Sequence, residues 1–323
     1  DHFGPRSLAV LDRGLSQLPQ PAHIVLQYVP HAFGFKAMNL PLSLWLPTRW
    51  RKRYWVMFHE VAYPFHRGQP WRHHLLAAVT HLMAALLVRG AARVFVSIEQ
   101  WEALLRRLTP SLPPCHWQPV PSNLDCQPDL VRCRQLRRQL APDPQAALIG
   151  HFGTFGTAIR QLLQRVLPAV LERDPRRIGL LVGRDSRGFA EQFLKNHPGL
   201  QGRLLALGGM SSADVAHHLA ACDVLLQPYP DGASTRRGSL MAGLALGLPI
   251  VTTLGPLSDS LFFKTDAVHA LPIERLDEMV EAVDTLLHKP DQRALLGQRA
   301  RTFYQQYCAV ENVVRAMRHY AEE

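Results

Sequence analysis

Cysteine is scarce in this chain of 323 residues, and long apolar runs are absent from it. The five cysteines are odd in number, are scattered and include no CxxC pair: Cys115, Cys126, Cys133, Cys222 and Cys308. This usage argues against a disulfide scaffold and against a structural zinc site, and it favours a reducing compartment. No apolar run approaches the roughly 20 residues that a membrane-spanning helix needs.

Targeting signals are also lacking at the start of the sequence. Residues 1–6 have neither the basic start nor the apolar core of a secretory signal. A hydrophobic fraction of 47% with 19% charged residues is typical of a globular protein. We therefore expect a soluble protein of the cytoplasm.

Acidic residues are outnumbered, because 26 Asp and Glu stand against 36 Lys and Arg, for a net charge of +10. A basic protein implies an acidic partner, which nucleic acid, anionic lipid or a phosphorylated small molecule would all satisfy. The arginines are dispersed and no nucleic-acid recognition motif is present. We expect no nucleic-acid partner, since such a partner would require steeply salt-dependent binding.

The densest basic stretch covers residues 45–55. Its cations alternate with aromatic side chains: Arg49, Arg51, Lys52 and Arg53 with Trp45, Trp50, Tyr54 and Trp55. Aromatic rings beside cations suit the headgroup layer of an anionic membrane, which predicts a protein peripheral to the inner membrane face. A solvated basic loop before a strand is the other interpretation, and the sequence leaves both open.

Apolar runs alternate with segments of helical period along almost the whole chain. This alternation is typical of parallel sheets joined by crossover helices, so we predict an α/β fold. The predicted strands are 24–29, 54–58, 94–97, 116–120, 147–150, 178–182, 203–207, 224–227 and 249–252. The predicted helices are 8–18, 71–89, 101–108, 158–171, 215–221 and the tail 291–320.

The length fits two domains of roughly 150 residues each. The stretch 110–114 and the run 119–144 are rich in proline and polar residues, which places the domain boundary there. We predict a first domain over 1–120, a linker over 121–145, a second domain over 146–300 and a C-terminal helix over 301–323.

The segment 223–253 predicts a phosphate site. It reads as a strand, a polar loop, a helix start and a second strand, with Arg236, Arg237, Gly238 and Ser239 where the helix begins. The first N–H groups of a helix are unpaired and carry partial positive charge. Two guanidinium groups and a hydroxyl beside such a helix end predict that a diphosphate binds there.

Other loops that follow strands of the second half converge on the same edge of the predicted sheet. The loops 153–156 and 232–238 contain glycines, which permit close approach of the backbone to a ligand, and 183–184 and 207–210 end two further strands. Ligands of open α/β folds bind at this edge, so we predict a nucleotide pocket. GxxxxGK[ST] and GxGxxG are both absent, which excludes P-loop and dinucleotide-binding interpretations.

Sixteen histidines raise the possibility of a metal site. The adjacent pairs His73–His74 and His217–His218 cannot form one, because neighbouring side chains on a helix point apart. We expect neither a metal nor another cofactor.

At this point the residues resemble a known family. Residues 207–210, 223–253 and 266–296 look like the donor domain of family 4 glycosyltransferases, which have the two-domain GT-B fold. The family's recurrent Ala-x-Gly-x-Pro-Val-Val-x-Thr stands here as Ala245-Leu-Gly-Leu-Pro-Ile-Val-Thr-Thr253.

The first half shows further similarity to the family. Phe58-His-Glu60 resembles the histidine at a strand end of the acceptor domain, 94–97 resembles the strand before the linker, and 119–123 resembles the linker entry. The resemblance implies two Rossmann-like domains whose parallel sheets face each other across a cleft, with the last helix packed back on the first domain. A helix precedes the first clear strand here, so we expect an N-terminal domain that lacks its first strand or strands.

The family also implies a function: a retaining glycosyltransferase that moves a sugar from a nucleotide diphosphate to a glycan, a lipid-linked acceptor or a small molecule, without a metal. Polysaccharide biosynthesis is the setting that this implies. The donor-binding residues would then be Gly153, Thr154, Gly156, Arg184, Met210, Ser234, Arg236, Arg237, Gly238, Ser239 and Leu240. Preorganised hydrogen-bond donors and cations of this kind stabilise the negative charge of a departing diphosphate.

The sequence departs from the family at its glutamates. Counting back from Gly247 places Ser234 and Ala242 where the family has its two glutamates. Asp231 is the candidate to replace the first of them next to the transferred sugar, although Pro-Asp-Gly is also an ordinary turn. A protein that holds a nucleotide sugar without transferring it is therefore the alternative function.

A second departure follows the first strand of the donor domain. His151 and Thr157 occupy roughly the places of the family's arginine and lysine. Arg236 and Arg237 are the predicted compensation, with Arg184 or Arg160 in reserve.

His59 is the second catalytic candidate, because it lies at the end of an apolar strand. By itself it reads as a buried, satisfied histidine, whereas the resemblance implies an imidazole that hydrogen-bonds a hydroxyl of the donor sugar. Glu60, His31 and His66 are candidates for the acceptor side.

Overall fold

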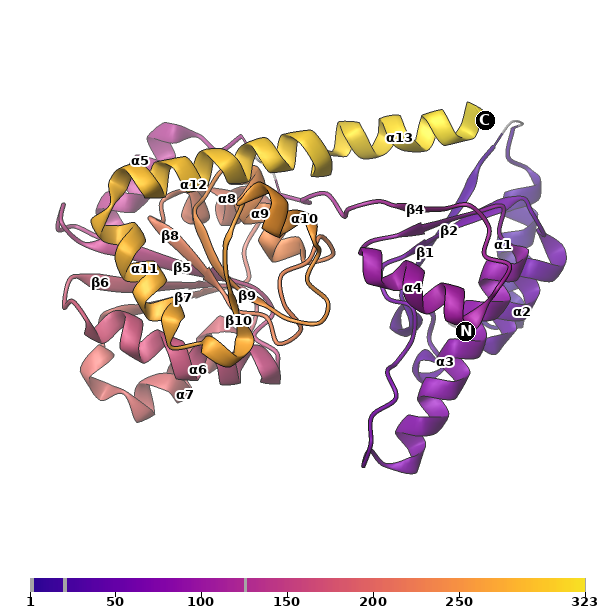
Figure 1. Ribbon diagram of the computed structural model, residues 1–323, viewed down its shortest axis with the longest axis horizontal. Coiled ribbons are helices and arrows are strands. Elements are labelled where there is room, and N and C mark those ends of the chain that lie inside the picture. Colours follow the sequence, from indigo (N-terminus) through magenta and orange to yellow (C-terminus); the bar gives the residue numbers. More distant parts are fainter. Residues whose placement is uncertain (1–2, 20–21, 125–126, 323) are drawn as a thin grey trace. The chain divides into compact units, whose positions relative to one another are not determined.

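The computed structural model of the protein describes residues 3–19, 22–124 and 127–322. The chain divides into two compact units: residues up to Pro119 together with those from Arg318 on, and Val120–Met317. Each unit contains one parallel sheet (Figure 1). The predicted α/β class with two parallel sheets is thereby confirmed.

The first unit is built on four parallel strands in the order β1-β2-β3-β4. They are β1 (Ile24–Tyr28), β2 (Tyr54–Phe58), β3 (Arg93–Val96) and β4 (Cys115–Trp117). All five residues of β2 are buried, as expected for an inner strand of a parallel sheet covered on both faces.

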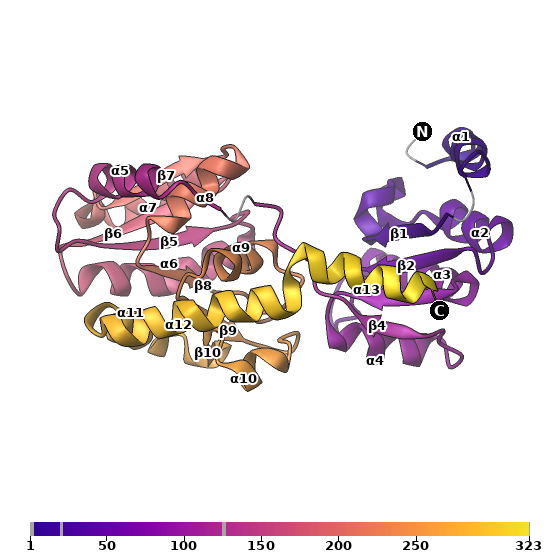
Figure 2. The same ribbon diagram turned by 90° about the horizontal axis from the view of Figure 1, so that it is seen from above.

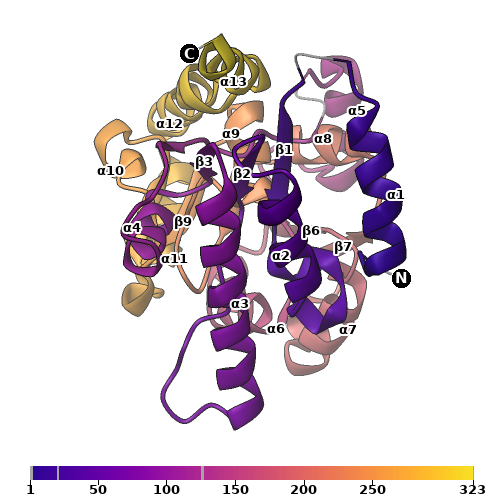
Figure 3. The same cartoon turned by 90° about the vertical axis from the view of Figure 1, so that its right-hand side faces the viewer.

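The helices of this unit are α1 (Pro5–Ser16), α2 (Leu40–Arg49), α3 (Trp71–Gly90) and α4 (Glu99–Leu108). Asn39 caps α2 by accepting a hydrogen bond from the Leu42 amide at 3.0 Å. Helices α2 and α3 pack side by side (Figure 3). The Tyr54 hydroxyl donates to the Leu87 carbonyl at 2.6 Å, which ties β2 to α3 within the core.

The second unit has six parallel strands in the order β10-β9-β8-β5-β6-β7 (Figure 2). They are β5 (Ala147–Phe152), β6 (Arg177–Val182), β7 (Leu204–Gly208), β8 (Val224–Gln227), β9 (Ile250–Leu254) and β10 (His269–Pro272). The chain adds β6 and β7 on one side of β5 and then returns to place β8 on the other side. This reversal makes the carboxyl ends of β5 and β8 the switch point where open sheets bind ligands.

The helices of the second unit are α5 (Leu130–Leu140), α6 (Thr157–Glu172), α7 (Ser186–Asn196), α8 (Ser212–Ala220), α9 (Gly238–Leu246), α10 (Leu261–Thr265), α11 (Glu278–His288), α12 (Pro290–Phe303) and the start of α13 (Val310–Glu322). Leu219 of α8, Leu244 of α9 and Phe303 of α12 share one buried cluster on one face of the sheet. Helices α6, α7 and α11 bury the other face (Figure 1).

Every predicted strand is present to within a few residues. Helices α2, α5, α7, α10 and α11 and strand β10 were not predicted. Prolines obscured two of these helices, since α2 contains Pro41 and Pro47 and α5 lies in a proline-rich segment. The predicted tail helix 291–320 is broken, because a π-helical turn (Tyr304–Cys308) follows α12 and Ala309 then adopts an extended conformation with ψ of 143°.

The basic, aromatic stretch 45–55 forms the second half of α2, the turn after it and the first two residues of β2. Trp50, Tyr54 and Trp55 are at most 8% exposed and pack inside the unit. The membrane interpretation is therefore wrong for these three rings, which are buried, whereas residues 51–53 form the solvated basic loop before a strand that the other interpretation predicted. Arg51, Lys52 and Arg53 remain exposed.

The range predicted as a linker, 121–145, contains α5, whose Leu136 joins the buried cluster of the second unit. Cys126 lies outside the described residues, and the four described cysteines are free. Of the helices that the structure describes, none combines the length and the hydropathy that a bilayer crossing needs.

Candidate functional site

A hollow of about 880 Å³ opens at the carboxyl ends of the strands of the second unit. Its walls come from the ends of β5, β6, β7 and β8 and from the start of α9, so it lies at the switch point of the sheet. Three arginines and one aspartate are among the residues that line it: Arg184, Arg236, Arg237 and Asp185. The charge of the lining favours an anionic ligand.

Helix α9 begins at this hollow. Arg237 is its N-cap residue, and every residue from Leu240 to Leu246 is buried, which fixes the helix in the core. The helix ends at Gly247 in a left-handed conformation with φ of 68°, where the Leu248 amide donates back to Gly243. Gly238 and Ser239, whose first-turn amides have no partner within the helix, line the hollow.

We call residues 229–237, which connect β8 to α9, the arginine loop. Within it the Asp231 carboxylate accepts one hydrogen bond from Arg236 on Oδ2 and one from Arg237 on Oδ1. The three side chains are 24%, 12% and 26% exposed, so the ion pairs are only partly screened by solvent. Asp231 was predicted to lie near the transferred sugar, yet it does not line the hollow.

Tyr229 contacts both Arg237 and Ser239. The Arg237 guanidinium lies 5.1 Å from the centre of the Tyr229 ring, and the Tyr229 hydroxyl is 2.8 Å from Ser239 Oγ. Burial raises the pKa of the Tyr229 phenol to about 12, so it stays neutral and protonated. Tyr229 was not predicted as a site residue, although it stands two residues after a predicted strand.

The loop that follows β9, residues 255–259, holds the arginine loop in place. Asp259 accepts hydrogen bonds from the Thr235 amide at 2.6 Å and from its hydroxyl at 2.8 Å. The Leu257 amide donates to the Asp231 carbonyl at 2.9 Å. Gly232 has φ of 92°, and a Cβ there would lie 2.1 Å from Ser258 Oγ, so the two loops meet at a distance that only glycine allows.

The loop 153–156 after β5 forms another wall of the hollow. The Gly153 amide donates to Val182, and a Cβ on Gly183 would lie 1.9 Å from the Gly153 carbonyl oxygen. Gly183 has φ of 141°, a conformation that L-residues rarely adopt. The ends of β5 and β6 therefore pack backbone to backbone.

His151 lies beneath this loop and is 2% exposed. Its Nδ1 is 2.8 Å from the Leu226 carbonyl oxygen, which can only accept, so Nδ1 carries the proton. Burial lowers the pKa of His151 to about 4, against an opposing effect of this hydrogen bond. His151 is thus neutral at pH 7 and supplies no charge to the hollow.

The structure gathers most of the predicted donor-binding residues around the hollow. Those that line it are Gly153, Thr154, Arg184, Met210, Arg236, Arg237, Gly238 and Ser239. Gly156, Ser234 and Leu240 do not line it, and Ser234 and Leu240 are fully buried. His151, Asp185 and Tyr229 line the hollow without having been predicted as site residues.

The candidates of the first unit follow two strands of its sheet. His31 follows β1, whereas His59 and Glu60 follow β2, so all three stand at the carboxyl edge of the sheet. His59 Nε2 lies 2.7 Å from Gln27 Oε1, and burial lowers the pKa of His59, against an opposing effect of Glu60. His66 is exposed in the loop before α3.

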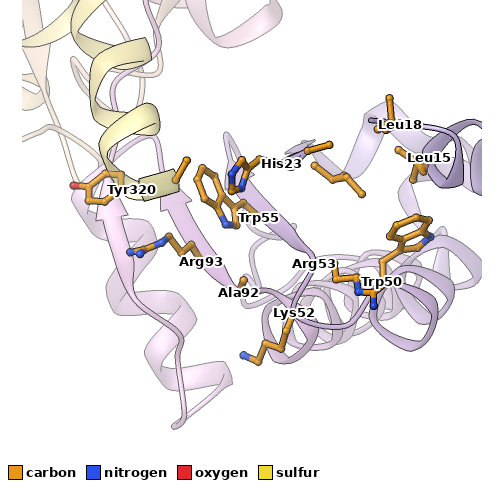
Figure 4. Close-up of a pocket in the computed structure, with 13 residues that line it drawn as sticks. Leu15, Leu18, His23, Trp50, Lys52, Arg53, Trp55, Ala92, Arg93 and Tyr320 are labelled. Atoms are coloured by element: carbon orange, nitrogen blue, oxygen red, sulfur yellow. The ribbon is translucent and has the colours of Figure 1, made fainter. Parts of the chain in front are cut away.

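A second hollow, of about 650 Å³, lies at the opposite, amino edge of the first sheet. Lys52, Arg53 and Arg93 line it, but Figure 4 shows their head groups well apart. Lys52 donates to the Ala91 carbonyl at 2.8 Å, and Arg93 lies 5.4 Å from the ring of Tyr320. These cations therefore do not converge on one position for an anion.

Comparison of the sequence with models of protein families and with curated protein sequences gives no match. Solved structures do match. Sucrose-phosphate synthase from Thermosynechococcus elongatus has a TM-score of 0.72 at 18% identity, over 98% of this chain and 77% of that chain. HepE from Anabaena, in complex with UDP and glucose, has a TM-score of 0.69 at 15% identity, over 99% of this chain and 83% of that chain.

WaaG, a glycosyltransferase involved in lipopolysaccharide biosynthesis, is also similar. It has a TM-score of 0.62 at 15% identity, over 94% of this chain and 92% of that chain. At such identities the similarity concerns the fold. Together with the two parallel sheets, it confirms the predicted GT-B fold.

Proposed function

We propose that the protein is a glycosyltransferase that takes its sugar from a nucleotide diphosphate bound in the hollow of the second unit. The observation that carries the proposal is the position of Arg236 and Arg237 at the N-terminus of α9, at the switch point of a GT-B donor-side sheet. The structures of HepE with UDP and with UDP-glucose support this class of ligand. Membership in family 4 is part of the proposal.

Transfer breaks the bond between the anomeric carbon and the β-phosphate oxygen, and it forms a bond to an acceptor hydroxyl oxygen, whose proton passes to the departing phosphate. The two guanidinium groups and the helix end stabilise the charge that develops on that phosphate. We propose that they replace a metal in this role and that the anomeric configuration is retained. His59 is proposed to hydrogen-bond a hydroxyl of the donor sugar.

A non-catalytic nucleotide-sugar-binding protein is the second candidate. Ser234 and Ala242, which stand in the places of the family's glutamates, are both fully buried and neither lines the hollow. A protein that had lost the groups that contact the sugar could still hold the diphosphate.

The acceptor is proposed to be a glycan or a lipid-linked glycan. Exposed Arg51, Lys52 and Arg53 support contact of the first unit with an anionic membrane. Flotation with vesicles that contain an anionic lipid tests this part. We expect binding that is lost in a variant with all three cations replaced by glutamine, and binding retained by that variant would contradict it.

The release of nucleoside diphosphate from a panel of nucleotide sugars tests the main proposal. We expect turnover with at least one donor, and we expect Arg236→Ala with Arg237→Ala to weaken nucleoside diphosphate binding more than about 100-fold, since each charge-assisted bond contributes about 1.5–3 kcal/mol. Binding without turnover, with acceptors supplied, would favour the second candidate. Unchanged binding in the double variant would refute the phosphate site.

A further inference from the structure

We propose that Asp231 is a positioning residue, which holds Arg236 and Arg237 ready for the diphosphate and does not touch the sugar. This inference rests on the proposed function, because it assigns the diphosphate to the two arginines. It replaces the role next to the transferred sugar that the sequence suggested.

The first step is the geometry of the carboxylate. Each of its oxygens accepts from one guanidinium, Oδ2 from Arg236 and Oδ1 from Arg237, so a single side chain bridges the two cations. Both arginines line the hollow, whereas Asp231 does not. The carboxylate is thus bonded to the arginines without lining the hollow in which the diphosphate is proposed to bind.

The second step concerns the N–H groups of the two arginines that Asp231 leaves available to a ligand. A guanidinium carries five N–H groups, and Asp231 occupies one on each arginine. Both guanidinium-bearing side chains line the hollow, and that of Arg237 is 26% exposed. The pair can therefore keep its carboxylate and still donate to a diphosphate, so displacement of Asp231 is not required for binding.

The third step is the rigidity of Asp231 itself. Its carbonyl oxygen accepts from the Leu257 amide, and a Cβ on Gly255 would lie 2.6 Å from its carbonyl carbon. The backbone of Asp231 is therefore fixed by the loop after β9, independently of the arginines. A fixed carboxylate removes rotamer freedom from two long side chains before a ligand arrives, and it lessens the repulsion between their charges.

Three roles of Asp231 predict different effects of Asp231→Asn, which keeps the size of the side chain and removes its charge. If Asp231 is a positioning residue, Asp231→Asn binds UDP and UDP-glucose more weakly by the same factor, about tenfold, because the ligand must then order two arginine side chains. A sugar contact predicts that only UDP-glucose binds less well. A competitor for the phosphate position predicts that UDP binds more tightly.

The experiment is calorimetric titration of the full chain with inorganic pyrophosphate, UDP and UDP-glucose. Asp266→Asn is the matched control, because Asp266 also pairs with an arginine, Arg299 at 3.7 Å, and does not line the hollow. We expect Asp231→Asn to weaken pyrophosphate and UDP alike, with an unchanged melting temperature. We also expect it to have no further effect once Arg236 and Arg237 are both alanine, as a double-mutant cycle measures.

Unchanged or tighter binding of pyrophosphate to Asp231→Asn would overturn the inference, and so would an effect confined to UDP-glucose. Wild-type protein that binds none of the three probes would also overturn it. Wild-type protein that binds pyrophosphate and responds to Asp231→Asn, but turns over no nucleotide sugar, would uphold the inference while refuting the proposed function.

Discussion

Asp259, which is 1% exposed, accepts two hydrogen bonds from Thr235, one from the backbone amide and one from the hydroxyl. The two residues stand 24 positions apart, on the loops after β9 and β8. Thr235 is followed directly by the two arginines that line the hollow. The placement of those arginines thus depends on a carboxylate from the neighbouring loop.

Asp259→Ala is expected to destabilise the protein and to weaken nucleoside diphosphate binding. The substitution leaves a buried amide and a buried hydroxyl without their acceptor, at a cost of about 2–3 kcal/mol. Thr235→Val removes only the hydroxyl bond and is expected to cost about 1 kcal/mol. Urea unfolding measures the loss of stability in each variant. Equal losses in the two variants would show that the bond from the Thr235 amide contributes nothing.

Stability is expected to fall as the pH is lowered from about 6.5 to 4, in part because of His151. The folded protein lowers the pKa of this histidine from 6.5 to about 4, so in this range the unfolded chain binds a proton that the folded chain does not. The histidine therefore lowers the free energy of unfolding by about 2 kcal/mol between pH 7 and pH 5.

Urea unfolding at pH 7 and pH 5 checks this expectation. His151→Gln keeps a donor for the Leu226 carbonyl but does not titrate, so its loss of stability should be smaller by that amount. His288→Gln is the control, because His288 is exposed on α11 and also bonds a backbone carbonyl, that of Asp284. An identical pH dependence of wild type and His151→Gln would contradict the burial of an uncharged imidazole.

Tyr229 is expected to support Arg237 through its ring rather than through its hydroxyl. Tyr229→Phe keeps the ring under the guanidinium and should change nucleoside diphosphate affinity less than threefold. Tyr229→Leu removes the cation–π contact, which contributes about 1–2 kcal/mol in a partly desolvated position, and should weaken affinity about tenfold. Calorimetric titration compares them, and equal affinities of the two variants would exclude the ring contact as a cause.

Gly232→Ala is expected to cost roughly 2–4 kcal/mol of stability. The glycine has φ of 92°, and the added Cβ would also lie 2.4 Å from the Gly255 amide nitrogen. The arginine loop would therefore have to move away from the loop 255–259. Gly188→Ala is the control, since no atom lies within 4 Å of the added Cβ and the residue is within α7. Thermal melts of both variants distinguish a steric cause from a general effect of alanine.

The grouping of the two arginines with a helix start at the hollow could be predicted from sequence because its signal is local. Arg236, Arg237, Gly238 and Ser239 adjoin one another at a helix start, in the segment that directly connects β8 to α9. The supports of the same site could not be predicted. Asp259 lies close to Thr235 only once β8 and β9 pair side by side, and Tyr229 reaches Arg237 only once the arginine loop has folded.

The basic, aromatic stretch illustrates a different limit. Alternating cations and rings in the sequence are compatible with a membrane surface, a solvated loop or a buried strand start. Burial of Tyr54 and Trp55 follows from the position of β2 between β1 and β3, which no local pattern reveals. Helix α2 was not predicted because of its prolines. Pro41 falls in the first turn of this helix, a position that tolerates proline.

The amino-acid sequence by itself determined the alternation of strands and helices, the parallel sheets and the glycine-bearing loops at one edge, because apolar periodicity and turn chemistry act over a few neighbouring residues. Only the tertiary structure decided that Asp231 faces two arginines, that His151 is buried and neutral, and that Asp259 anchors the arginine loop. The contact of Asp231 depends on how its loop folds, whereas the last two features depend on strands that are remote in sequence and on the desolvation that packing imposes on titratable groups.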